Sequence, residues 1–113
     1  MSTSTFYRAT VTINRYAADT SEVPGYVSRA CPAIAVTRSS DRHPWVLTHV
    51  PTGRSMSRMF PRLGDAKRTA AAVAEALAAA GADVSTTDPD EAARRIVAAP
   101  GAYAALFPRT TGR

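Results

Sequence analysis

The sequence predicts an α+β domain, in which a four-stranded, mainly antiparallel sheet is covered on one face by a helix over about residues 65–80, with a second helix over about residues 89–99. Three observations predict this class. Short alternating or β-branched segments, separated by turn residues, fill the N-terminal half. Alanine-rich segments with apolar residues at three- and four-residue spacing fill the second half. With 113 residues, the chain has the size of a single domain, and we expect residues 1–5 and 109–113 to be flexible.

The first strand is predicted over residues 6–16, where apolar and polar side chains alternate without interruption from Tyr7 to Asn14. Such a strand is half-buried and has a solvated polar face. Residues 17–32 contain two prolines and a glycine and show no sustained period. They are expected to form a long connection, with a short helical turn near residues 21–28.

The other three strands are predicted over residues 33–39, 45–50 and 54–60. A turn rich in serine, with an aspartate and a proline, separates the first two of them. The last two form a hairpin around Gly53, since glycine adopts the positive φ that such loops need.

The register of this hairpin has two possibilities. A four-residue loop pairs Val50 with Ser55, and a three-residue loop pairs Val50 with Arg54. A shift of one residue moves every side chain of a strand to the other face, so the register decides which face carries Arg58.

Both helices have recognisable ends. Asp65 is expected to cap the first helix and Gly81 to end it, and alanine has the highest helix propensity. Asp88 and Pro89 suit the start of the second helix. Residues 102–107 add an apolar tail that packs on the core or, alternatively, forms an exposed docking segment. The face of the first helix that is expected to pack on the sheet consists of Ala66, Ala70, Val73, Ala74 and Leu77.

The net charge of +5 belongs to the sheet-forming half. Residues 1–68 contain ten basic and four acidic residues, whereas residues 69–113 contain four basic and five acidic ones. Thirteen of the fourteen basic residues are arginine, whose flat guanidinium group suits phosphate. The abundance of alanine indicates a high-GC coding sequence, as in some bacteria and phages, which also favours arginine over lysine.

No arrangement of residues indicates catalysis, a metal site or a cofactor. Cys31, His43 and His49 match no metal-ligand spacing, and the two histidines are expected to be solvated in a turn and packed in a strand, respectively. No glycine-rich loop precedes a helix, which argues against a nucleotide cofactor. The acidic residues near Asp88 are explained by the start of a helix. We therefore expect a protein that is not an enzyme.

Basic residues interspersed with aromatic ones predict binding of nucleic acid, either DNA or RNA. Cations contact phosphates, and aromatic rings stack on bases. The candidate site residues fall within 31 residues of the chain and are Arg38, Arg42, Trp45, Arg54, Arg58, Arg62, Lys67 and Arg68. Their positions predict an arginine-rich surface on the sheet and its hairpin.

The order of three strands and a helix in residues 33–80 resembles the arm-binding domains of some integrases. Those domains lay a three-stranded sheet in the major groove of DNA. The resemblance is one of topology, and it implies that the sheet of this chain binds DNA.

The alternative function is a protein-interaction or inhibitory module, such as a bacterial, plasmid or phage accessory factor. Its partner would be an acidic protein, or a second copy that pairs through a sheet edge. A free edge is expected because four short strands cannot close a barrel. No apolar segment is long enough for a membrane span, and the start does not read as a secretory signal. We therefore expect a cytoplasmic protein without a membrane partner, and the lone Cys31 agrees with a reducing compartment.

Overall fold

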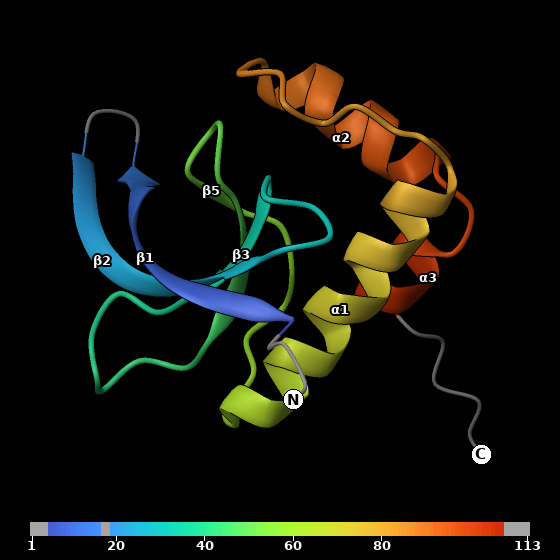
Figure 1. Cartoon of the computed structure of the whole chain (residues 1–113). Coiled ribbons are helices and arrows are strands. Elements are labelled where there is room, and N and C mark those ends of the chain that lie inside the picture. The colour runs from blue at the N-terminus through green and yellow to red at the C-terminus, as the bar shows by residue number, and fades with distance from the viewer. Residues whose placement is uncertain (1–4, 17–18, 108–113) are drawn as a thin grey trace.

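The computed structural model describes residues 5–16 and 19–107 of the chain. They form a five-stranded antiparallel sheet and three helices, which confirms the predicted α+β class (Figure 1). We predicted that residues 1–5 and 109–113 are flexible. Apart from Thr5, these residues lie outside the described part of the chain.

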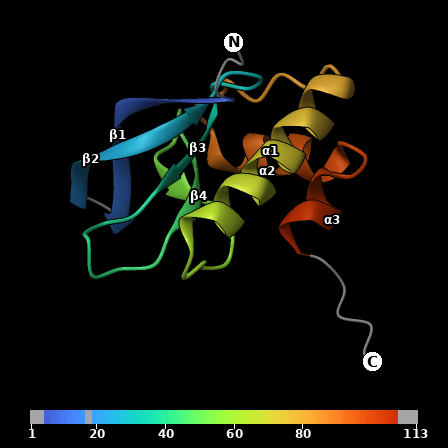
Figure 2. The ribbon, with the colours of Figure 1, turned by 60° about the horizontal axis from the view of Figure 1, so that its bottom comes forward.

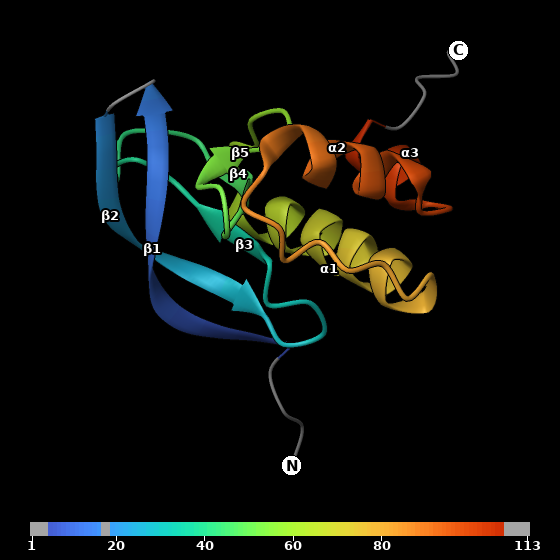
Figure 3. The ribbon, with the colours of Figure 1, turned by 90° about the horizontal axis from the view of Figure 1, so that it is seen from above.

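The sheet is a meander in which every strand pairs with its neighbour in the sequence. β1 and β2 form a long curved ribbon that extends away from the helices (Figure 3). The other three strands are short and lie beside the helical layer. The strands are β1 (Phe6–Tyr16), β2 (Asp19–Ser28), β3 (Ile34–Thr37), β4 (Val46–His49) and β5 (Arg54–Ser55).

β2 occupies most of residues 17–32, so the long connection and the helical turn predicted there are wrong. Val23 and Val27 are buried on the same face, but Pro24 and Gly25 hide this alternation in the sequence. Pro24 precedes Gly25, the first residue of β2 that pairs with β3. The missing N–H of proline therefore interrupts no hydrogen bond between these two strands.

The sheet curves so strongly that β1 meets the loop between β4 and β5. The backbone N–H of Asn14 donates to the carbonyl oxygen of Gly53 over 2.7 Å, and its side-chain amide donates to the carbonyl oxygen of Thr52. Gly25 permits close packing on this inner face, because a Cβ there would lie 3.0 Å from side-chain atoms of two neighbouring strands. The small apolar core that the curved sheet encloses consists of Val11, Ile13, Val23, Val27 and Ala35.

Replacing Gly53 with alanine is expected to open this contact. Gly53 has a φ of +73°, and a Cβ at this position would lie 2.9 Å from the carbonyl oxygen of Thr12. Gly81 is the matched control, because it has a φ of +64° but no atom within 4 Å of the corresponding Cβ position. Positive φ costs Gly81→Ala about 1 kcal/mol, and the close approach adds at least about 1 kcal/mol for Gly53→Ala. Urea unfolding measures both values, and equal losses would contradict the contact.

The β4–β5 hairpin adopts neither of the two predicted registers. His49 pairs with Arg54, and Thr48 pairs with Ser55. The four-residue loop therefore starts at Val50, one position earlier than in the predicted four-residue loop. This register places Arg54 directly opposite His49, on the side of the sheet that faces the helices.

Beyond Ser55 the ladder is interrupted, so the predicted strand over residues 54–60 is wrong for most of its length. The hydroxyl of Ser57 accepts a hydrogen bond from the N–H of Leu47 over 2.9 Å, in place of a backbone carbonyl. The N–H of Met56 still donates to the carbonyl oxygen of Leu47 over 2.8 Å, and Trp45 and Phe60 form an isolated bridge. Arg58 thus lies in an irregular segment.

Helix α1 (Leu63–Ala79) packs on one face of the sheet, as predicted, and contacts β2, β3 and β4 (Figure 2). Its start differs from the prediction: Arg62 is the N-cap residue without a side-chain hydrogen bond, and Asp65 lies in the first turn, where it pairs with Arg68. Gly81 follows the helix with the expected positive φ. The predicted apolar face is confirmed, since all of its members are buried: Ala66, Ala70, Val73, Ala74 and Leu77.

Helices α2 (Pro89–Ala98) and α3 (Ala102–Leu106) complete the helical layer. Asp88 caps α2 as predicted and accepts from the N–H of Asp90 over 3.0 Å. The apolar tail forms α3 and packs on the core, which is the first of its two predicted alternatives. Its Leu106 is buried in the core, whereas Tyr103 is half-exposed.

Candidate nucleic-acid interface

Five side chains from distant parts of the sequence meet beside the first turns of α1. Two are aromatic and three are cationic, and they come from four strands, or the residues next to them, and from α1. We call this group the basic–aromatic cluster. Its members are Arg8, Tyr26, Arg38, Trp45 and Lys67.

The cations of the cluster lie over the rings. The centroids of Tyr26 and Trp45 are 6.0 Å apart, with the rings tilted by 56°. The guanidinium carbon of Arg38 lies 4.2 Å from the centroid of Trp45. Lys67 Nζ and the guanidinium carbon of Arg8 lie 4.1 Å and 5.3 Å from the centroid of Tyr26. All three distances are within the range of cation–π attraction, which fixes the directions of these long side chains.

Strand pairing brings these residues together. Arg8 is directly opposite Tyr26, and Tyr26 is directly opposite Val36, so the three share one face of the sheet. Arg38 follows Val36 by two residues and belongs to the same face. Trp45 is fixed by its two backbone hydrogen bonds with Phe60, of 2.8 and 2.7 Å.

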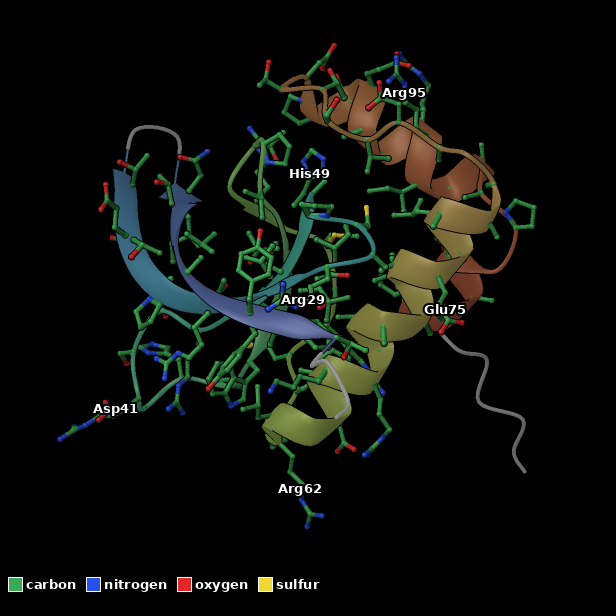
Figure 4. The ribbon with its side chains drawn as sticks, in the orientation of Figure 1. Arg29, Asp41, His49, Arg62, Glu75 and Arg95 are labelled. Carbon is green, nitrogen blue, oxygen red and sulfur yellow. The ribbon has the colours of Figure 1, made fainter. Side chains whose placement is uncertain are left out.

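A hollow of about 450 Å³ opens beside the cluster. Both aromatic rings line it, together with Arg8, Arg38 and the turn that follows β3. Asp41, at the tip of this turn, contributes the acidic side chain of the lining (Figure 4). The hollow therefore combines flat aromatic surface with cations, the two features that contact bases and phosphates.

None of the three cations of the cluster forms an ion pair with a carboxylate of the described residues. The ion pairs within the described residues join Arg68 to Asp65, and Arg94 and Arg95 to Glu91. The N-terminal end of the 17-residue helix α1 adds partial positive charge next to the cluster. The surface around the cluster is consequently attractive to anions.

The structure separates the eight residues predicted from the sequence into three groups. Arg38, Trp45 and Lys67 belong to the cluster. Exposed arginines flank it: Arg42 in the turn after β3, Arg62 at the start of α1, and Arg58, whose guanidinium carbon lies 5.2 Å from the ring centroid of Phe60. The remaining two point elsewhere, since Arg68 pairs with Asp65 and Arg54 lines a groove beside α2 and α3.

Arg8 and Tyr26 are the members that the sequence did not indicate as site residues. Arg8 lies on the polar face of β1, where a solvated surface is the ordinary interpretation. Tyr26 belongs to the segment that was interpreted as a connection. The alternation of Val23, Gly25 and Val27 is the signal that identifies β2 and turns Tyr26 toward Arg8.

Other reactive groups are held in structural contacts. Nε2 of His49 donates to the carbonyl oxygen of Val84 over 2.6 Å, and its Nδ1 lies 2.9 Å from the hydroxyl of Thr52. Burial raises the pKa of the Cys31 thiol, and the hydrogen bond from the backbone of Ala33 opposes this shift only in part. A raised pKa makes the thiol a weaker nucleophile at neutral pH. Within residues 5–16 and 19–107, no group of three or more histidine, cysteine and acidic residues is placed to hold a metal ion.

No helix among the described residues is both long and apolar enough to span a lipid bilayer. The chain has no significant match to a protein-family model, a curated protein sequence or a solved structure.

Proposed function

We propose that this protein binds single-stranded nucleic acid through the basic–aromatic cluster. Bases stack on the rings and guanidinium planes of the cluster, and phosphates contact its cations and the flanking arginines. The observation that carries this proposal is the stacking of three unneutralised cations on two neighbouring aromatic rings beside an open hollow. Guanidinium and aromatic planes are the surfaces on which proteins stack unpaired bases.

The geometry favours a single strand over a duplex. The rings of Tyr26 and Trp45 are half-buried at the edge of a hollow, where an unstacked base can reach them but a paired base cannot. The protruding β1–β2 ribbon is the alternative reader of a duplex groove. Its polar face offers Arg8 but also the exposed Glu22, which repels phosphate.

Fluorescence anisotropy with labelled oligonucleotides tests the proposal. A single-stranded DNA or RNA should bind with a dissociation constant of about 1–100 µM at physiological salt, the range of sequence-independent binding. A duplex of the same sequence should bind more weakly. Affinity that is undetectable even at low salt would contradict nucleic-acid binding, and a preference for the duplex would move the site to the β1–β2 ribbon.

A further inference from the structure

A second surface lies on the other side of the molecule, between the β4–β5 hairpin and the helices α2 and α3. It is a groove of about 340 Å³. Arg54 and Met56 line it from the hairpin, and Asp90, Val97 and Tyr103 line it from the helical layer. Figure 1 shows β5 and α2 facing each other across this region. We call this surface the α2–α3 groove.

The α2–α3 groove exposes apolar side chains. Val97, Tyr103 and Phe107 are 57%, 51% and 48% exposed, and they are three of the five large hydrophobic side chains that are exposed among the described residues. The rings of Tyr103 and Phe107 pack on each other, with centroids 5.2 Å apart. Apolar side chains gathered around one groove, rather than scattered singly, are typical of a protein interface.

Two charges on the walls of the groove have no ion-pair partner in the described structure. Arg54 projects from β5, and Asp90 projects from the first turn of α2, but the two are not paired with each other. The neighbouring Glu91, in contrast, pairs with Arg95 and Arg94, and these hydrogen bonds lower the pKa of its carboxyl group. One free cation and one free anion on the same surface complement each other when that surface meets its own copy about a two-fold axis.

We propose that the α2–α3 groove is the interface of a symmetric dimer, in which a second copy of this chain covers Val97, Tyr103 and Phe107. Arg54 of each copy pairs with Asp90 of the other. The basic–aromatic cluster stays accessible in this dimer, because Figure 4 places Arg62, next to the cluster, and Arg95, on α2, at opposite ends of the molecule. Dimerisation does not depend on the proposed binding of nucleic acid.

Sedimentation equilibrium of the full chain, over low to high micromolar concentrations, tests the dimer by charge reversal. The wild-type chain should dimerise reversibly. Arg54→Asp or Asp90→Arg alone places like charges together and should raise the dissociation constant about tenfold or more. The double variant restores both pairs and should return the dissociation constant to near the wild-type value. A wild-type chain that stays monomeric, or a double variant that stays as weak as either single variant, would overturn the proposal.

The apolar part of the interface has its own matched pair of variants. Replacing Tyr103 and Phe107 with serine should make the chain monomeric. Tyr7→Ser, which alters an aromatic ring that is 37% exposed outside the groove, should leave dimerisation unchanged. Circular dichroism verifies that each variant is folded. A dimer that survives the loss of both rings would place the interface elsewhere.

Discussion

Replacing Arg38 and Lys67 together with alanine should weaken the binding of a single-stranded oligonucleotide about 100-fold at low salt. Each side chain lies over an aromatic ring of the basic–aromatic cluster, at 4.2 and 4.1 Å from the respective centroid. A hydrogen bond to a charged group is worth about 1.5 kcal/mol, and two such losses correspond to about two factors of ten. The same anisotropy titration that detects binding by the wild-type chain measures the loss.

The matched control removes the same charge from another place. Arg94 and Arg95 both pair with Glu91 on α2, at the opposite end of the molecule from Arg62 (Figure 4). Arg94→Ala with Arg95→Ala lowers the net charge equally, but it should weaken binding only about threefold, through the long-range field. Equal losses in the two double variants would mean that net charge alone, and not the cluster, determines the affinity.

His49→Leu should lower the free energy of unfolding by about 3 kcal/mol, because the buried carbonyl oxygen of Val84 loses its donor, at about 2 kcal/mol, and the hydrogen bond to Thr52 is lost, at about 1 kcal/mol. His49 is 3% exposed, and its imidazole joins the sheet to the segment between α1 and α2. Nε2 donates to the carbonyl oxygen of Val84 over 2.6 Å, and Nδ1 contacts the hydroxyl of Thr52. For a domain of this size, the loss corresponds to a decrease in Tm of about 10–20 °C.

His43 provides the comparison for this variant. Its side chain is exposed, and Nδ1 contacts only the hydroxyl of Ser40 in the turn after β3, over 2.6 Å. His43→Ala should therefore change the free energy of unfolding by less than about 0.5 kcal/mol. Thermal and urea unfolding measure both variants. A similar small effect for His49→Leu would show that its contacts do not hold the sheet and helices together.

The regular elements could be predicted because their periodicity is local. β1 alternates without interruption, and the small apolar residues of α1 repeat at helical spacing, so both elements and their buried faces follow from the sequence. β2 was not predicted, since Pro24 and Gly25 hide its alternation. Pro24 lies outside the pairing with β3, and Gly25 packs too closely against its neighbours for a larger residue. β5 is short because the N–H of Leu47 donates to the hydroxyl of Ser57 and not to a backbone carbonyl of the neighbouring strand.

The candidate site was predictable only in part, because it depends on pairing between distant residues. Arg38, Trp45 and Lys67 are cationic or aromatic residues within one basic segment, so composition indicates them. Tyr26 and Arg8 join them through the register of β1 against β2, which no local signal fixes. Conversely, the register of the β4–β5 hairpin turns Arg54 toward α2, although its sequence position places it among the other arginines.

The most direct measurement of nucleic-acid binding at the cluster is the fluorescence of Trp45, the only tryptophan of the chain. Titration with an unlabelled single-stranded oligonucleotide at low salt should quench its emission to saturation, because a base that stacks in the hollow changes the surroundings of the ring. Added salt should reverse the quenching as phosphate contacts are lost. Binding that leaves the emission of Trp45 unchanged would contradict this site.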